Sequence, residues 1–169
     1  MITIREIQPA DAEQFLALRL RLDEETKFML LEPGERTTTL PQQEEHIRAV
    51  LVQENQTILV AEAGSLLVGY IAGFGGSHRR NRHKADIVIG ILLPYTGQGL
   101  GQHLFSALEE WARAVGLHKL ELTVMINNKR AIHLYQKMGF VVEGKSVDSL
   151  LVDNRFVDEY DMAKILAHT

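Results

Sequence analysis

Cysteine is absent from the 169 residues of the chain. Disulfides, thiolate nucleophiles and cysteine-based zinc sites are therefore excluded together, and we expect no metal site. A chain without cysteine also suits a reducing compartment, so we expect a cytoplasmic location. No apolar run approaches the roughly 20 residues needed to cross a bilayer. Residues 1–5 lead directly into a strand pattern, so we expect neither a targeting signal nor a membrane partner.

An excess of basic residues is also lacking, because the formal net charge is −4. Such a chain has no overall positive field to hold a nucleic acid backbone, and we expect no nucleic acid partner. Hydrophobic residues make up 46% and charged residues 24%, which is typical of a globular protein. Linkers, repeats and low-complexity segments are missing, so we expect one domain over residues 1–169.

The chain is organised around a strand followed by a glycine-rich turn and a helix. Residues 87–93 are almost all apolar and largely β-branched, which predicts a strand buried on both faces and ended by Pro94. From Leu100 onward apolar residues recur at spacings of three and four, which predicts an amphipathic helix. The glycines at the junction occupy alternate positions: Gly97, Gly99 and Gly101.

Alternate glycines between a strand and a helix predict a binding site for an anion. Glycine lets the backbone turn tightly, and the helix N-terminus presents N–H groups and the positive end of the helix dipole. The segment is neither of the common phosphate fingerprints, because Gln102 breaks G-x-G-x-x-G and no Gly-Lys-Ser/Thr follows. The alternative is a glycine-rich turn that binds nothing.

The remaining elements follow from apolar periodicity and turn residues. We expect a first strand ended by Pro9, a helix opened by Asp11, and a second helix from about Pro41 to Glu54. Further strands are expected at 57–62, 66–74 and 119–126, then a helix within 127–140 and a terminal hairpin that turns at 152–155. Residues 78–84 form a basic loop.

Residues 127–140 carry a more specific pattern, Asn-Asn-Lys-Arg-Ala-Ile-His-Leu-Tyr-Gln-Lys-Met-Gly-Phe. Together with the glycine turn, this stretch resembles the core of the GNAT superfamily of acyl-CoA-dependent N-acetyltransferases. The family's Asn-x-x-Ala-x-x-Leu-Tyr-x-(Lys/Arg)-x-Gly-Phe segment is matched at every position. The family's (Arg/Gln)-x-x-Gly-x-(Gly/Ala) loop is matched except at Thr96, which leads us to expect weaker cofactor affinity.

The resemblance implies an α/β (α+β) fold with a mixed, mostly antiparallel central sheet flanked by helices, in the order β-α-α-β-β-β-α-β-α-β-β. It implies acetyl-CoA as co-substrate. The central strand would separate from its neighbour at residues 90–92 and bind the pantetheine arm, and the turn would bind the pyrophosphate. The cofactor-binding residues implied in this way are Ile89, Gly90, Ile91, Gly97, Gln98, Gly99, Leu100, Gly101, Gln102, Asn128 and Tyr135.

Amide formation from a thioester needs a deprotonated amine, a donor for the oxyanion and stabilisation of the departing thiolate. The resemblance places Tyr135 beside the sulfur as a general acid, although an aromatic residue at helical spacing is also a common core residue. Asn128 is either a ligand of the pantetheine arm or a helix N-cap, and both roles are compatible. The resemblance implies Asp86 as the base, because related acetyltransferases often carry a Glu there that acts through a water, and His83 is the rival.

The function we predict is an N-acetyltransferase acting on a primary amine of a small molecule or a peptide. A non-catalytic acyl-CoA-binding module on the same fold is the alternative. Acidic residues of the first two helices and the terminal hairpin would favour a cationic acceptor; these are Glu24, Glu25, Glu32, Glu35, Asp153 and Asp158. A homodimer through the terminal strands, using Phe156, Val157 and Tyr160, is also expected.

Overall fold

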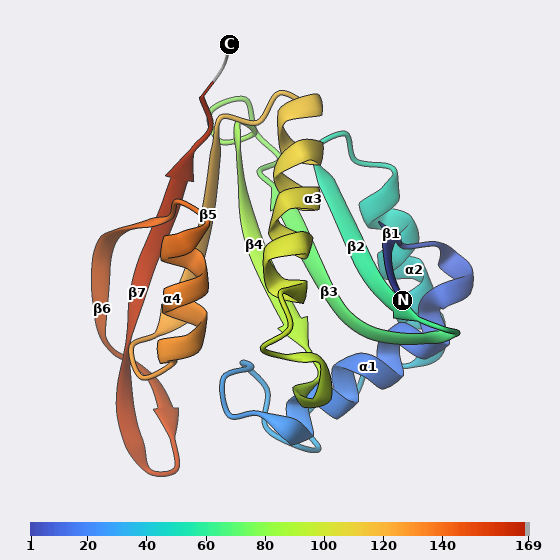
Figure 1. Ribbon diagram of the computed structural model, residues 1–169, viewed down its shortest axis with the longest axis horizontal. Coiled ribbons are helices and arrows are strands. Elements are labelled where there is room, and N and C mark those ends of the chain that lie inside the picture. The colour runs from blue at the N-terminus through green and yellow to red at the C-terminus, as the bar shows by residue number, and fades with distance from the viewer. Residues whose placement is uncertain (168–169) are drawn as a thin grey trace.

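The computed structural model describes residues 1–167, in which seven strands and four α-helices follow the predicted order (Figure 1). Short 3-10 turns lie at Pro9–Asp11 and Leu93–Tyr95. The elements are β1 (Ile2–Glu6), α1 (Ala12–Glu25), α2 (Leu40–Leu51), β2 (Gln56–Ala63), β3 (Leu66–Gly75), β4 (Lys84–Ile91), α3 (Leu100–Ala114), β5 (Lys119–Met125), α4 (Lys129–Lys137), β6 (Val141–Val152) and β7 (Arg155–Ile165).

All seven strands form one sheet in the order β1-β2-β3-β4-β5-β7-β6. Every neighbouring pair is antiparallel except β4 and β5, so the predicted mixed and mostly antiparallel sheet is confirmed. The predicted terminal hairpin is also present. Asp153 and Asn154 form its two-residue loop with φ of 51° and 63°, the left-handed backbone of a type I′ turn.

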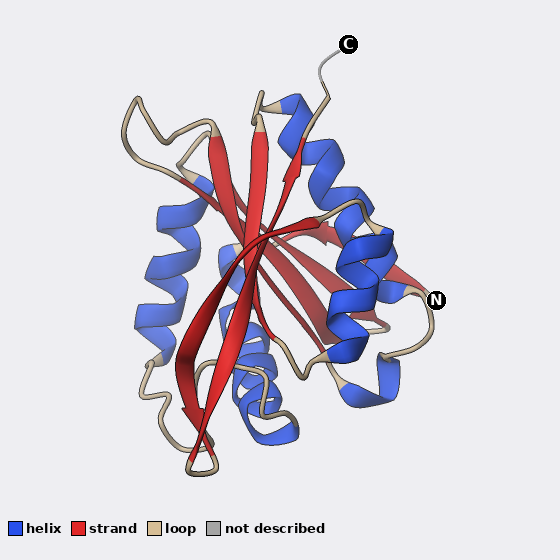
Figure 2. Ribbon diagram, turned by 90° about the vertical axis from the view of Figure 1, so that its left-hand side faces the viewer, coloured by secondary structure: helices blue, strands red, loops and turns tan. Residues whose placement is uncertain are grey.

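The helices cover both faces of the sheet (Figures 1 and 2). On one face Phe15 of α1 packs edge-on against Tyr70 of β3, with ring centroids 5.1 Å apart. On the other face a Cβ at Gly73 would lie 3.0 Å from the Trp111 ring of α3. The α1–α2 face and the α3–α4 face are therefore the two sides of the molecule.

The start of α2 is set by a capping box. The Thr39 side chain accepts from the Gln42 N–H at 3.3 Å, and the Gln42 side chain accepts from the Thr39 N–H at 2.9 Å. Pro41 lies in the first turn, as predicted. The helix ends at Leu51, three residues before the predicted end near Glu54, because residues 52–55 turn the chain into β2.

β4 and β5 pair over only three residues and then separate. The last pair is Asp86 with Glu121, although β4 continues to Ile91 and β5 continues to Met125. β5 stays paired with β7 along all seven of its residues, so it follows β7 away from β4. The separation was predicted at residues 90–92 and begins three residues earlier, at Ile87. It opens the centre of the sheet.

The prediction that the central strand is buried on both faces is wrong. Exposure alternates along β4: Ala85 and Ile87 are buried, whereas Asp86 is exposed and Val88 retains 40% exposure. The strand also starts at Lys84. Beyond Asp86 the strand has lost its neighbour on one side, so an apolar sequence lines an opening there.

Candidate active site

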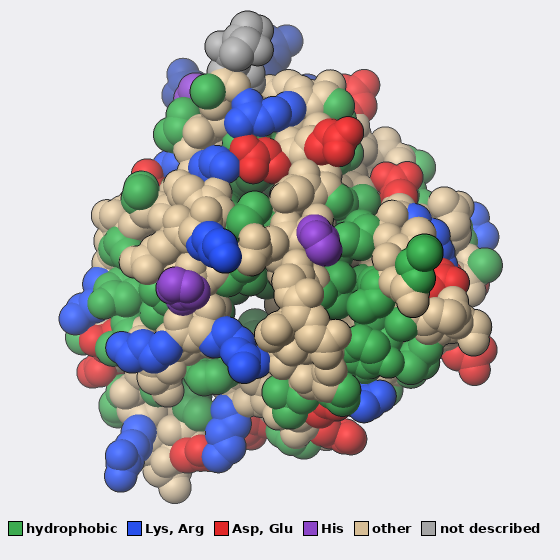
Figure 3. All heavy atoms as spheres, in the orientation of Figure 1, with side chains coloured by type: hydrophobic (Ala, Val, Ile, Leu, Met, Phe, Trp, Pro, Cys, Tyr) green, Lys and Arg blue, Asp and Glu red, His purple; other side chains and the backbone are tan. Residues whose placement is uncertain are grey.

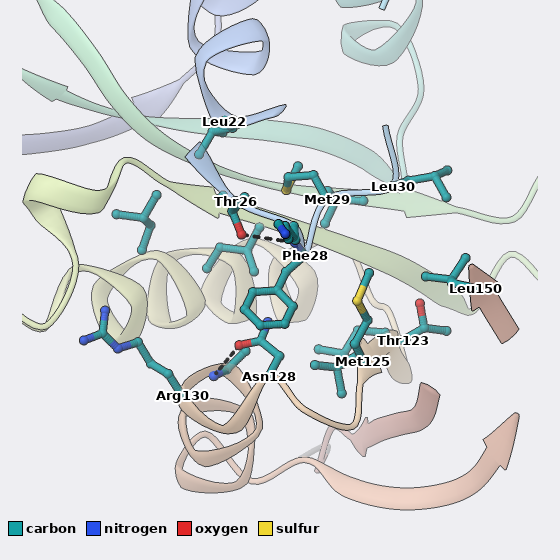
Figure 4. Close-up of a pocket in the computed structure, with 18 of the residues that line it drawn as sticks. Leu22, Thr26, Phe28, Met29, Leu30, Thr123, Met125, Asn128, Arg130 and Leu150 are labelled. Carbon is teal, nitrogen blue, oxygen red and sulfur yellow. Dashed lines mark hydrogen bonds between the residues drawn. The ribbon is translucent and has the colours of Figure 1, made fainter. Parts of the chain in front are cut away.

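A cleft of about 1440 Å³ occupies the split between β4 and β5. Its walls are formed by residues 87–91 of β4, residues 122–125 of β5, α4, the C-terminal half of α1, Tyr70 of β3, the α1–α2 loop and the terminal hairpin. The molecule is hollowed between α3 and α4 (Figure 3). Figure 4 shows side chains from the α1–α2 loop, β5 and α4 around the same cavity.

One wall of the split presents unpaired backbone groups. The Leu92 N–H donates to the Val68 carbonyl at 2.9 Å, and the Gly76 N–H donates to the Lys84 carbonyl at 3.2 Å. Both bonds show that the even-numbered residues of β4 bond to β3, because bonded residues alternate in an antiparallel pair. The N–H and C=O groups of Ile87, Ile89 and Ile91 consequently point toward β5, beyond the last β4–β5 pair.

The facing wall is built in the same way. The Leu166 N–H donates to the His118 carbonyl, and the Ile126 N–H donates to the Asp158 carbonyl, so the even-numbered residues of β5 bond to β7. The backbone of Thr123 and Met125 points toward β4. An extended amide-containing chain placed in the split would therefore meet strand backbone on both sides, as an added strand does.

Gly90 has a packing role that the sequence did not show. A Cβ at this position would lie 2.7 Å from Cδ1 of Leu22 and 3.2 Å from Cε1 of Tyr70. Its backbone belongs to the even-numbered set that bonds to β3. Glycine is needed here so that α1 can approach the sheet beside the split.

The glycine turn has the geometry of an anion site. Gly97 and Gly99 have φ of 72° and 84°, and Gly99 is the N-cap of α3 without any side-chain cap. The backbone N–H groups of residues 97–102 donate no hydrogen bond to any acceptor within residues 1–167. These N–H groups and the dipole of a 15-residue helix suit a pyrophosphate. The backbone of Gly97, Gln98, Gly99, Leu100, Gly101 and Gln102 thus fits the role predicted for it.

Two residues of the turn also have structural roles. The Gln98 side chain donates to the Pro94 carbonyl at 2.9 Å, which ties the turn to the end of β4. A Cβ at Gly101 would lie 2.7 Å from Cδ2 of Leu134, so this glycine lets α3 pack closely on α4. The third glycine lies within α3 and has no positive φ, so its role is in helix packing and not in the turn.

Arg130 is a candidate binding residue that the sequence analysis missed. Its guanidinium Nη2 lies 4.0 Å from where a Cβ on Gly97 would be, and its side chain lines the cleft (Figure 4). Thr96 also lines the cleft, and its hydroxyl donates to the Leu93 carbonyl at 2.7 Å. A cation from α4 thus stands beside the turn in place of the family's Arg or Gln at position 96.

Tyr135 lines the cleft from α4 and is only 7% exposed. Its ring packs against Phe105 and Phe140, with centroids 5.5 Å and 6.3 Å away. Burial raises the pKa of Tyr135 to about 12. In the described part of the chain no hydrogen bond involves its hydroxyl. The Tyr135 ring therefore packs in the core, and part of the side chain also lines the cleft.

Asn128 is the N-cap of α4, and its side chain accepts from the Ala131 N–H at 3.3 Å. It also lines the cleft, where Figure 4 shows it near the start of the helix. The capping role is thus confirmed, and it leaves the amide nitrogen of Asn128 available to the cleft.

Asp86 lies apart from these residues. It lines a separate hollow of about 420 Å³ with Lys84 and Glu121, and it does not line the cleft. Asp86 precedes Gly90 by four residues, or about 13 Å along a strand. Burial, and then the charge of Glu121, raise the pKa of its carboxyl. The rival base, His83, precedes β4 and is farther still along the chain.

The acidic wall expected around the acceptor is only partly present. Glu25 and Asp153 line the cleft, whereas the other four predicted acids do not. Asp153 is paired with Lys27 at 2.5 Å across the mouth, and Glu25 is paired with Arg21. The cleft is lined by five cationic residues and three acidic ones, a formal balance of +2; these are Arg19, Lys27, Arg36, Arg130 and Arg155 against Glu25, Asp153 and Glu159.

Among residues 1–167, no helix is both long and apolar enough to cross a bilayer. In the same range, no group of three or more His, Asp or Glu side chains is placed to hold a metal ion.

Comparison with known proteins agrees with the geometry. The family model described as the Acetyltransferase (GNAT) family matches residues 19–140. The spermidine N(1)-acetyltransferase of Vibrio cholerae is 30% identical over 112 residues, which cover 66% of this chain and 59% of that protein. The L-amino acid N-acetyltransferase AaaT of Escherichia coli is 31% identical over 111 residues, covering 63% of this chain and 67% of that protein.

Solved structures resemble the whole described fold. An acetyltransferase of the GNAT family from Streptococcus pneumoniae superimposes with a TM-score of 0.95 at 33% identity, covering 99% of this chain and all of that one. The yncA protein of Salmonella typhimurium, solved with acetyl-CoA, gives a TM-score of 0.88 at 22% identity over 100% and 96% of the two chains. The second likeness shows the fold alone.

A mixed sheet that splits at its centre, with an uncapped helix N-terminus at the end of the split, defines an acyl-CoA-dependent transferase fold. The chain belongs to the GNAT family of acetyltransferases.

Proposed function

We propose that this protein transfers the acetyl group of acetyl-CoA to the primary amine of a small molecule or a peptide. The observation that carries the proposal is the split between β4 and β5. Its unpaired backbone leads from the centre of the sheet to the uncapped N-terminus of α3. An extended pantetheine arm needs a strand-like wall of free backbone groups, and the pyrophosphate at its end needs an anion site next to that wall.

In this proposal the chain's own residues hold the co-substrate at two places. The N–H groups of residues 97–102 and the Arg130 guanidinium bind the pyrophosphate. The backbone of Ile87, Ile89 and Ile91 bonds the arm along the split, with Asn128 on the far side. The Ile91 N–H, one of the unpaired groups of this wall that point into the split, is the donor that we propose for the oxyanion.

The reaction forms one C–N bond and breaks one C–S bond, and one proton leaves the amine while the thiolate gains stabilisation. Tyr135 is the donor toward that sulfur. With a pKa of about 12, its phenol stays protonated through the neutral range. Complete proton transfer to a thiolate of pKa about 8.5 is uphill. Tyr135 therefore acts mainly by donating a hydrogen bond to the developing negative charge.

The amine must arrive at the split without its extra proton. An amine of pKa about 10 is mostly protonated at neutral pH, so a small neutral fraction reacts or water removes the proton. Asp86 does not line the cleft and lies about 13 Å along the strand from Gly90, so its carboxylate would not directly contact an amine placed beside Gly90. We propose that water in the open cleft takes the proton, in place of the base predicted from the sequence.

A thioester assay tests the function. Release of free CoA from acetyl-CoA would be followed with a panel of amino acids, polyamines and peptides, and the acetylated amine would be identified by mass spectrometry. Turnover with any amine above the rate of thioester hydrolysis supports the enzyme. Tight acetyl-CoA binding without turnover on any acceptor would favour the non-catalytic binding module instead.

We also propose a homodimer and a cytoplasmic location. Phe156 of β7 is 67% exposed beside its β6 partner Leu151, whereas Tyr160 packs against the core. An exposed aromatic and aliphatic pair on a terminal hairpin suits a self-contact. Sedimentation at micromolar concentration distinguishes a dimer from the 19.1 kDa monomer. A chain without cysteine suits a reducing compartment such as the cytoplasm.

A further inference from the structure

The floor of the cleft on the α1–α2 face contains two arginines, Arg19 of α1 and Arg36 of the α1–α2 loop. Arg36 forms a bidentate ion pair with Asp23, at 2.7 Å and 3.0 Å. The two side chains of this pair are only 8% and 2% exposed. Both carboxylate oxygens of Asp23 thus accept from Arg36, and Asp23 forms no ion pair with a second cation.

Arg19 has no carboxylate partner among residues 1–167. Its guanidinium donates to Oε1 of Gln43 at 2.7 Å and stands over the Phe15 ring at 5.7 Å. Burial, and then the charge of Arg36, lower the pKa of Arg19. A half-buried guanidinium is normally matched by an anion, because an uncompensated charge is costly in a desolvated place.

Gln43 fixes the position of that unmatched cation. The Gln43 side chain is completely buried, and its Nε2 has no hydrogen-bond partner in the described chain. The Gln43 carbonyl oxygen accepts from Arg19 while the buried Nε2 group of the same amide stays without an acceptor. A buried donor without an acceptor costs free energy in a protein interior. The arrangement holds the Arg19 guanidinium at the cleft, although no carboxylate of the described chain is in direct contact with it.

The arginines stand beside the point where the amine must arrive. Tyr70 pairs with Gly90 across β3 and β4, packs on Phe15, and lines the cleft with both arginines. Tyr135 approaches the split from the α3–α4 side, where it packs on Phe105 of α3. The proposed thioester site thus lies between the Tyr135 phenol on the α3–α4 face of the sheet and Arg19 and Arg36 on the α1–α2 face.

We propose that the acceptor is a primary amine that carries a carboxylate, as an α-amino acid does, and that Arg19 binds this carboxylate. The inference rests on the proposed acetyltransferase function. The +2 balance of the cleft walls agrees with an anionic group on the acceptor and opposes a polyamine. Apolar residues line the same side of the cleft, so the acceptor carries an apolar substituent; Figure 4 shows Phe28, Met29 and Met125 there.

Matched acceptors test the carboxylate directly. L-Leucine, L-leucinamide and 3-methylbutylamine share one side chain and one amine but differ in the carboxylate, and methionine and phenylalanine give equivalent sets. We expect kcat/KM for the acids to exceed that for the amides by about 100-fold or more, since a site built for a charged group rejects its neutral analogue strongly. Spermidine serves as the polycationic comparator and is expected to be a poor acceptor.

Variants then assign the preference to Arg19. Arg19→Met should lower kcat/KM for leucine by about 100-fold and leave leucinamide within about threefold, whereas Arg19→Lys should recover part of the loss. Arg155→Met removes an exposed cation of the same cleft, and Arg48→Met removes one on the outer surface of α2; neither should change the ratio. Melting temperature and acetyl-CoA affinity verify that each variant is folded.

A binding measurement supplies a readout besides turnover. Calorimetry with the CoA-loaded protein should show N-acetyl-leucine binding at least tenfold more tightly than N-acetyl-leucinamide, with the difference lost in Arg19→Met. Equal use of acids and amides, a preference for spermidine, or loss of the preference in Arg155→Met would overturn the assignment while leaving the acetyltransferase intact. Failure to acetylate any amine despite acetyl-CoA binding would overturn the proposed function and this inference together.

Discussion

Asp86 and Glu121 are the last two residues that join β4 to β5, and their side chains lie on the same face of the sheet in one hollow. Beyond them the parallel pair ends and the cleft begins. The two carboxylates therefore mark the closed end of the split. Their mutual repulsion contributes to the raised pKa of Asp86, after burial.

Asp86→Asn is expected to change kcat/KM by less than about threefold, because the residue lies about 13 Å along the strand from Gly90. A steady-state assay over pH 6 to 9 checks this. In the variant the rate should still rise with pH as the amine loses its proton. A fall of about 10²-fold or more in a folded variant would show that Asp86 is the base acting through water.

The same variant should affect stability with a definite sign. A raised pKa means that folding disfavours the ionised Asp86, so its contribution is favourable below the ordinary value of 3.8 and is lost as pH rises through the folded value. Asp86→Asn should therefore melt higher at pH 7, by about 1–3 °C for a partly exposed group. The difference should vanish near pH 3. A lower melting temperature at pH 7 would contradict the repulsion.

Tyr135→Phe keeps the packing against Phe105 and Phe140 but removes the donor to the sulfur. We expect kcat to fall by about 10²–10³-fold, the loss typical of one donor to a developing negative charge, while acetyl-CoA affinity changes little. The measurement is CoA release on one good acceptor, with affinity determined separately by calorimetry. Tyr160→Phe, on β7, is the matched control and should turn over like the wild type. Turnover of Tyr135→Phe within about threefold of wild type would remove this residue from the chemistry.

Arg130→Met should weaken acetyl-CoA binding by about tenfold and make that binding less sensitive to salt, because a charged contact beside the glycine turn is lost. Lys129→Met is the matched control, since it removes one charge from the same helix start without facing the cleft. Isothermal titration at two ionic strengths measures both effects. Equal affinities for the two variants would show that Arg130 does not contact the pyrophosphate.

Asp23→Ala should destabilise the protein by about 3–5 kcal/mol, because it leaves the Arg36 guanidinium buried without its bidentate partner. Urea unfolding monitored by fluorescence of Trp111 measures the change. Glu44→Ala breaks an exposed ion pair with Arg48 and should cost less than about 1 kcal/mol. A similar small loss in Asp23→Ala would mean that the α1–α2 loop is not anchored by this pair.

Much of the fold follows from local patterns. Pro41 identifies the start of α2, and the capping box at Thr39 explains why the helix begins there. Asp153 and Asn154 tolerate left-handed backbone, so they identify the hairpin turn. The glycine turn and the Asn128 cap are similarly local. Each depends on residues within four positions of one another, which is the range over which sequence alone specifies geometry.

The split between β4 and β5 is not a local property. The apolar run 87–91 predicts a buried strand, and only the pairing of β5 with β7 shows that the neighbour departs after Asp86. Gly90 illustrates the same limit, since its missing side chain makes room for Leu22 of a distant helix. The distance between Asp86 and the cleft likewise depends on where the sheet opens.

The sequence by itself determined the family resemblance, the order of the elements, the glycine turn and the place of Tyr135 on α4. The tertiary structure alone decided which charges meet in the cleft. Arg19 lies in a helix that is apolar on more than one side, and Arg36 lies in an irregular segment, so no periodicity marks either residue. Asp23 neutralises Arg36 and leaves Arg19 to Gln43, because packing of α1, α2 and the loop brings four separate positions together.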